Sequence, residues 1–161
     1  MTGNRAGPDI ESERVETEVF EMTYTNEIKK ETIGQYWLTP PDLFKELDSE
    51  FHFNFDPCPY PYLRDGCEIE WGTSNYVNPP FRKKDAMNWH GPTAFVRKAI
   101  EENKKGKQSV LIIPTQSYVN LLLEAGAETR SMGRVKWIDG ISGKACTGPS
   151  PVSLFILRGK Q

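Results

Sequence analysis

Ser109-Val110-Leu111-Ile112-Ile113 is the stretch that sets the fold class, because four apolar residues follow one another over the length of a single strand. Such runs are typical of strands buried on both faces of a parallel sheet. Helical patterns flank this strand, at residues 93–103 and at the leucine-rich segment 118–125. Because strand and helix alternate along the chain, the sequence predicts an α/β fold.

Further elements are expected on both sides of this strand. Thr39 followed by Pro40-Pro41 predicts a helix that ends near residue 50, with a hydroxyl cap and proline in its first turn. Short strands are expected at residues 51–55, 75–77, 134–138 and 152–158. We therefore expect a mostly parallel sheet with an antiparallel C-terminal edge and helices on both faces.

Length and composition predict one ordinary globular domain. The chain has 161 residues, of which residues 1–33 are read as an acidic, loosely ordered arm and residues 34–161 as the organised domain. No apolar run approaches the roughly 20 residues that cross a bilayer. No basic segment followed by an apolar stretch indicates a secretory signal. We expect a cytoplasmic protein without membrane contact.

The sequence lacks the usual signatures of several other functions. Its three cysteines, Cys58, Cys67 and Cys146, contain no C-x-x-C pair and are expected to be free thiols. Zinc binding by these cysteines with His52 or His90 fits no familiar spacing, so no metal is expected. There is no phosphate-binding Gly-x-x-x-x-Gly-Lys motif, and no Ser-His-Asp arrangement is apparent.

Charge is distributed unevenly along the chain. The formal net charge is -2, but residues 82–107 carry eight basic side chains against three acidic ones. A basic segment of this kind suits a polyanionic partner such as nucleic acid. For residues 97–107 a solvated helix face explains the charges equally well, so both interpretations stay open there.

Asn78-Pro79-Pro80-Phe81, directly after a predicted strand, is the motif that best indicates chemistry. An exocyclic amine is a poor nucleophile because its lone pair is delocalised into the base. The Asn78 side-chain oxygen and the Pro79 carbonyl could accept both N–H protons and localise that lone pair, and two prolines hold the backbone rigid. Phe81 offers a face on which a flipped-out base could stack.

Several short motifs, in order, resemble those of phage-type DNA N6-adenine methyltransferases of the Dam type. The resemblance covers roughly residues 35–158. The segments that carry it are Trp37-Leu38-Thr39-Pro40, Phe55-Asp56-Pro57-Cys58, Asp65-Gly66-Cys67 with Trp71, Val77-Asn78-Pro79-Pro80-Phe81, Leu111-Ile112-Ile113-Pro114 and Pro149-Ser150-Pro151-Val152.

This resemblance implies a function and a set of site residues. It implies an abbreviated Rossmann-like methyltransferase sheet, a methyltransferase domain at residues 34–161, S-adenosylmethionine as cofactor and double-stranded DNA as partner. The implied catalytic residues are Asn78, Pro79, Pro80 and Phe81. The implied cofactor-binding residues are Trp37, Thr39, Pro40, Asp56, Pro57, Cys58 and Asn78. Contacts to DNA are expected from Arg82, Lys83, Lys84, Trp89 and His90.

Departures from the family pattern keep alternatives open. After Asp56-Pro57-Cys58-Pro59 no glycine occurs until Gly66, whereas larger methyltransferases have a glycine-rich loop there. No separate target-recognition domain is apparent. One alternative is a non-catalytic nucleic-acid-binding protein on a decayed methyltransferase fold. Another is an amino-methyltransferase that acts on RNA or on the N4 amine of cytosine. The recognition sequence and oligomeric state are left open.

Overall fold

The structure is a computed structural model that describes residues 37–61, 64–81, 90–148 and 150–160. These residues belong to the compact unit Thr32–Gln161. The expected acidic arm lies outside the described residues. The elements in chain order are β1 (Trp37–Leu38), α2 (Pro41–Phe51), the 3₁₀ turn η1 (Gly66–Glu68), β2 (Ser74–Val77), α3 (Pro92–Lys104), β3 (Gln108–Pro114), α4 (Val119–Glu124), β4 (Glu128–Gly133), β5 (Lys136–Asp139), β6 (Ala145–Thr147) and β7 (Val152–Leu157).

Two sheets form the framework, and their topology corrects the expected fold. Sheet B has the strand order β2-β3-β7-β4, and sheet A has the order β1-β5-β6. Only β2 and β3 pair in parallel, whereas β7 is antiparallel to both of its neighbours. Sheet A is antiparallel throughout. The expectation of a mostly parallel, Rossmann-like sheet with an antiparallel edge is therefore wrong: this is a small α/β protein with one mixed and one antiparallel sheet.

Two local features explain the difference. The C-terminal strand β7 inserts between β3 and β4 and brings antiparallel pairing into the middle of sheet B. The strand expected at residues 51–55 is reduced to one parallel bridge between Phe55 and Asn75, because α2 continues through Phe51. Sheet B therefore lacks the parallel strand expected at residues 51–55. Its antiparallel strand β7 lies in the interior of the sheet and not at the edge.

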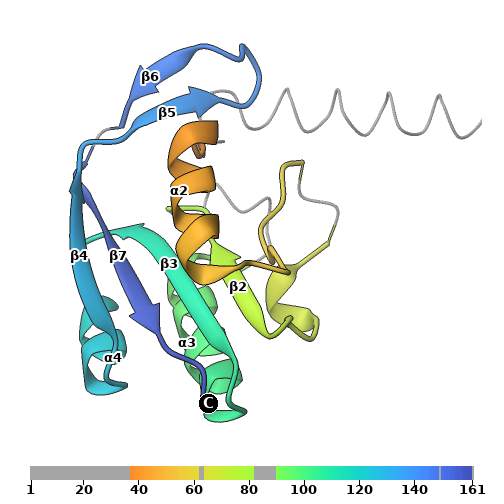
Figure 1. Cartoon of the computed structure of the whole chain (residues 1–161). Coiled ribbons are helices and arrows are strands. Elements are labelled where there is room, and N and C mark those ends of the chain that lie inside the picture. Colours follow the sequence, from red (N-terminus) through yellow and green to blue (C-terminus); the bar gives the residue numbers. More distant parts are fainter. Residues whose placement is uncertain (1–36, 62–63, 82–89, 149, 161) are drawn as a thin grey trace, which may run out of the picture. The chain divides into compact units, whose positions relative to one another are not determined.

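Helices cover both faces of sheet B (Figure 1), with α2 in front and α3 and α4 behind in this view. Along β3, Val110 and Ile112 belong to the core cluster that includes Leu47 of α2. Side chains alternate between faces along a strand, so the fully buried Leu111 and Ile113 point to the opposite face. That face is covered by α3, which contacts β3 and β7.

The sequence predicted the helices better than the strands. The three expected helices are confirmed as α2, α3 and α4, and the apolar run is confirmed as β3. The expected hydroxyl cap of α2 is wrong, because the capping residue is Pro40 and the Thr39 hydroxyl bonds to Tyr76 instead. Strands β1, β4 and β6 were not predicted. None of the helices in the described part of the chain has the length and apolarity to cross a membrane.

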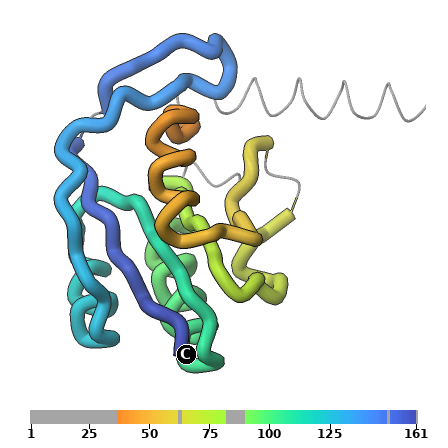
Figure 2. Tube along the Cα trace, viewed as in Figure 1, coloured from red at the N-terminus to blue at the C-terminus, as the bar shows by residue number. Residues whose placement is uncertain are grey.

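Sheet A is a small extension at the end of the molecule where α2 begins (Figure 2). Trp37 pairs with Asp139, so the chain just before α2 becomes the strand next to β5. Trp137 of β5 is fully buried and joins the same core cluster as Val110 and Leu154 of sheet B. This packing holds sheet A, and with it β1, in a fixed position relative to sheet B. The candidate site described below lies where β1 meets the end of a strand of sheet B.

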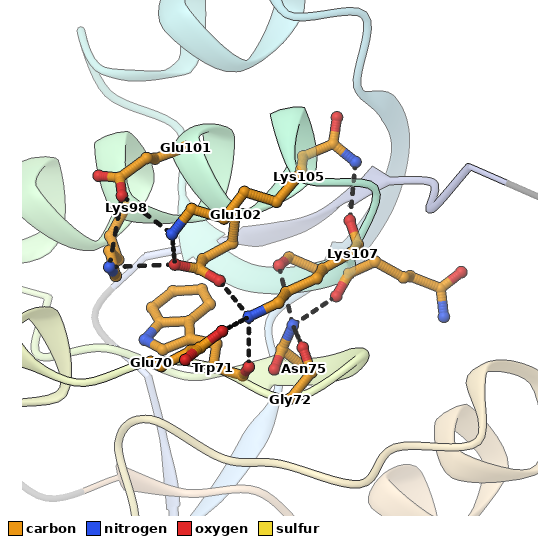
Figure 3. Close-up of polar contacts among 12 residues, drawn as sticks. Glu70, Trp71, Gly72, Asn75, Lys98, Glu101, Glu102, Lys105 and Lys107 are labelled. Carbon is orange, nitrogen blue, oxygen red and sulfur yellow. Dashed lines mark hydrogen bonds and ion pairs between the residues drawn. The ribbon is translucent and has the colours of Figure 1, made fainter.

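A buried carboxylate ties α3 to the strands beside it (Figure 3). The Glu102 side chain is 0% exposed, and its oxygens lie 3.0 Å from Lys98 Nζ, 2.8 Å from Lys105 Nζ and 2.6 Å from Lys107 Nζ. Lys107 Nζ also donates to the Trp71 carbonyl oxygen at 2.6 Å. Three of the basic side chains in the segment 82–107 are therefore paired with Glu102, of which Lys98 and Lys107 are mostly buried and Lys105 is exposed.

Candidate functional site

The residues after β2 lie at the edge of sheet B where the parallel strands β2 and β3 both end. Asn78 directly follows Val77, the last residue of β2, and β3 ends at Pro114. Pro79 and Pro80 are both buried. In open α/β sheets this edge is the usual place for ligands, because side chains and loops there are free of strand pairing.

The side-chain amide of Asn78 has a fixed orientation. Its Nδ2 donates to the Trp37 carbonyl oxygen at 2.8 Å, across 41 residues of chain. A carbonyl oxygen can only accept a hydrogen bond, so the nitrogen must face Trp37 and the oxygen Oδ1 must point the other way. Pairing of β1 with β5 holds the Trp37 carbonyl in this place. The sequence predicted Asn78 as a functional residue, but not the contact that orients it.

Three aromatic rings lie together beside the Asn78 amide. The ring of Phe81 meets Trp137 edge-on at 5.6 Å between centroids, and Trp37 meets Trp137 edge-on at 6.4 Å. Trp137 is fully buried, and its Nε1 has no hydrogen-bond partner within the described chain. Phe81 is thus held by packing on one side and half-exposed on the other.

Tyr76 connects two of the sequence-predicted segments. Its hydroxyl bonds to the Thr39 hydroxyl, which joins the start of α2 to β2. Burial raises the pKa of Tyr76 well above its usual value, with the charges of Asp56 and Cys58 adding to the effect. The Tyr76 backbone N–H also donates to the Phe55 carbonyl oxygen at 3.0 Å, so the turn that follows Phe55 starts beside Tyr76.

The turn Asp56-Pro57-Cys58 lies at the same edge of sheet B. The bridge between Phe55 and Asn75 is parallel, so the chain leaving Phe55 runs alongside Tyr76 towards the end of β2. The Cys58 backbone N–H donates to Asp56 Oδ1 at 2.7 Å, and Cys58 itself is buried. Although Asp56 is exposed on one side, desolvation of its carboxyl raises its pKa to about 6.

The structure therefore brings together three segments that the sequence had predicted to act together. Trp37 contacts Asn78 directly, Thr39 bonds to the residue two before Asn78, and Asp56 lies on the neighbouring parallel segment. Pro40 caps α2 next to Thr39. Which of these residues bind a cofactor stays a prediction.

Of the residues predicted to contact DNA, only His90 is among the described residues. Arg82, Lys83, Lys84 and Trp89 lie outside the described residues. His90 Nδ1 lies 2.5 Å from Asp65 Oδ2, so the ring is engaged within the protein. Its role towards DNA stays a prediction.

A second cluster contains Cys67 and His90, which the sequence analysis named as possible zinc ligands although it expected no metal. One ligand-type atom from each of Asp65, Cys67 and His90 lies within 4.8 Å of the others. Asp65 Oδ1 accepts the Cys67 backbone N–H at 2.9 Å. The sequence contained no signal for His90 joining it, because 25 residues separate the two partners.

No protein-family model, curated protein or solved structure matches this chain. The functional assignment therefore depends on the short sequence motifs and on the geometry at the end of β2.

Proposed function

We propose that this chain is an S-adenosylmethionine-dependent DNA methyltransferase that methylates the N6 amine of adenine. The observation that carries the proposal is the fixed amide of Asn78, which follows a strand end and is oriented by the Trp37 carbonyl at 2.8 Å. This contact leaves Oδ1 as an acceptor that needs no reorientation when a substrate amine arrives. The order of the short motifs around it supports the same function.

The proposed reaction needs positioning more than it needs a base. Asn78 Oδ1 and the Pro79 carbonyl accept the two N–H protons of the amine, which turns its lone pair towards the methyl donor. S-adenosylmethionine, when bound, would supply an electrophilic methyl group with the cofactor sulfur as leaving group. Asn78 and Pro79 stabilise the charge that develops on the nitrogen, and water takes the surplus proton.

The residues near Asn78 offer a suitable environment for this cofactor. Asp56 Oδ1 is used by the Cys58 N–H, which leaves Oδ2 to accept from a ligand hydroxyl or ammonium group. Cys58, next to that carboxylate, and Tyr76 are both buried, so one side of the Asp56 turn is packed against the protein. Trp37 and Thr39 complete the set through their contacts with Asn78 and Tyr76. The chain has no glycine-rich loop, so Asp56 would carry most of the polar recognition.

Methyl transfer from isotope-labelled S-adenosylmethionine to unmethylated double-stranded DNA tests the proposal. We expect the label in N6-methyladenine after nucleoside mass spectrometry of the digested DNA. Label in N4-methylcytosine, or only in RNA offered in parallel, would replace the proposed substrate. A folded protein that binds DNA but transfers no label would favour the non-catalytic alternative.

Asp56→Asn is expected to weaken cofactor binding while slightly stabilising the fold. The pKa of Asp56 is raised from 3.8 to about 6, so the native state holds its proton more tightly than the unfolded state. The free energy of unfolding therefore falls as pH rises from about 4 to about 6, and asparagine removes this loss. Because Asp56 is partly exposed, we expect a gain below about 1 kcal/mol at pH 7.

Calorimetry with S-adenosylmethionine measures the change in cofactor affinity. Urea unfolding at pH 4 and pH 7 measures the change in stability. Loss of one charge-assisted hydrogen bond predicts binding weaker by about 10-fold or more. Asp42→Asn, on the exposed first turn of α2, is the matched control and should bind normally. Unchanged cofactor affinity in Asp56→Asn would remove Asp56 from the binding site.

A further inference from the structure

Three side chains with metal-binding groups meet where η1 faces the start of α3. Asp65 and Cys67 lie on either side of Gly66, and His90 lies two residues before Pro92, the first residue of α3. Their ligand atoms lie within 4.8 Å of one another. We propose that Asp65, Cys67 and His90 bind a zinc ion that joins η1 to the start of α3. This site is separate from the proposed catalytic residues and does not depend on them.

Two of the ligands are already oriented towards a common point. Asp65 uses Oδ1 to accept the Cys67 N–H at 2.9 Å, which turns Oδ2 towards His90 Nδ1 at 2.5 Å. The carboxylate thus sits between the thiol-bearing residue and the imidazole. A metal ion would replace the Asp65–His90 hydrogen bond with a shared coordination centre.

The backbone that carries Asp65 and Cys67 is held rigidly. At Gly66, an added Cβ would lie 2.0 Å from the Pro57 carbonyl oxygen, so this turn is packed directly against its neighbour. The Gly66 carbonyl accepts the Trp71 indole N–H at 2.8 Å in a buried position. A rigid support of this kind lowers the entropy lost when ligands are fixed around a metal.

The chemistry of the three groups selects the metal. Thiolate and imidazole suit Zn²⁺, which binds with sulfur and nitrogen ligands in a tetrahedron, whereas Mg²⁺ and Ca²⁺ prefer oxygen ligands. At zinc bond lengths, neighbouring ligands lie roughly 3.4 Å apart. The cluster therefore needs only small side-chain rotations, with water as the fourth ligand. The Cys67 thiol proton passes to the buffer when the ion binds.

Zinc content and cobalt spectroscopy of the full chain test the site. After incubation with Zn²⁺ and gel filtration, we expect about one zinc per chain by mass spectrometry, as a single three-residue site requires. Replacing zinc with Co²⁺ should give a thiolate-to-cobalt charge-transfer band in the near ultraviolet. A chain that retains no zinc and gives no such band would leave Asp65 and His90 as a simple hydrogen-bonded pair and overturn the proposal.

Variants identify the ligands, and the chain offers a matched control for two of them. Cys67→Ser and His90→Gln should each weaken zinc binding by at least about 100-fold, while Cys146→Ser and His52→Gln should bind zinc normally. Asp65→Asn keeps the acceptor for the Cys67 N–H. It provides a third variant if circular dichroism shows that one of the other two does not fold. Zinc bound equally by Cys67→Ser and His90→Gln would place the metal elsewhere and refute the site.

Discussion

Asn78→Ala is expected to lower kcat for methyl transfer by about 100- to 1,000-fold, the usual loss when one preoriented hydrogen-bonding group is removed from a transition state. Alanine removes the Oδ1 acceptor that would localise the lone pair of the substrate amine. It also removes the bond from Nδ2 to the Trp37 carbonyl, which is worth about 1 kcal/mol of stability. Stability should therefore change far less than turnover.

Single-turnover kinetics and urea unfolding of the same preparation separate these effects. Asn120→Ala is the matched control, because Asn120 is exposed on α4. It should behave as the original chain in both measurements. If Asn78→Ala methylates DNA at the normal rate, the motif is a strand terminator and the catalytic assignment is wrong.

The sequence predicted those parts of the fold that depend on local patterns. Helix α3 was found because its apolar residues repeat with the helical period, and strand β3 because four apolar residues follow one another. Strand β4, Glu128–Gly133, is mostly polar and forms because β7 pairs with it, with an irregularity between Ser131 and Gly133. Nothing local signals such a strand, so its place, and the position of β7 inside sheet B, could not be read from the sequence.

The candidate site, too, was predicted where it depends on a local motif and was not predicted where it depends on contacts between distant residues. Asn78 was found because it belongs to a short motif after a strand, whereas its partner is the backbone carbonyl of Trp37, which any residue would supply. Thr39 looked like a helix cap, but the nearby Tyr76 hydroxyl competes for it. No local pattern links Asp65 to His90, and only the folded chain brings the two residues together.

Glu102→Ala is expected to lower the free energy of unfolding by about 3 kcal/mol, the usual cost of removing one partner from a buried ion pair. The glutamate is 0% exposed, and the side chains of Lys98 and Lys107 are each only 15% exposed. Alanine would leave these two ammonium groups close together without their shared carboxylate. Loss of the link to Lys107 would also loosen the contact between α3 and the Trp71 carbonyl.

Glu101→Ala is the matched control on the same helix. Glu101 lies 3.6 Å from Lys98 Nζ and 3.2 Å from Lys105 Nζ, but its side chain is 58% exposed. Water screens exposed pairs, so we expect a much smaller loss than in Glu102→Ala. Equal losses in the two variants would show that burial of Glu102 adds nothing.

The pH dependence distinguishes lost charge from lost packing. Desolvation raises the pKa of Glu102, but hydrogen bonds from Lys105, Lys107 and Lys98 outweigh it and lower the pKa to about 2. Because the native pKa lies below the ordinary 4.5, the stabilisation is complete above pH 4.5 and is lost as pH falls towards 2. In urea unfolding, the difference between the original chain and Glu102→Gln should stay constant from neutral pH down to about 4.5 and shrink below it. A difference that stays constant below pH 4.5 as well would mean that packing, and not the carboxylate charge, holds α3 to its neighbours.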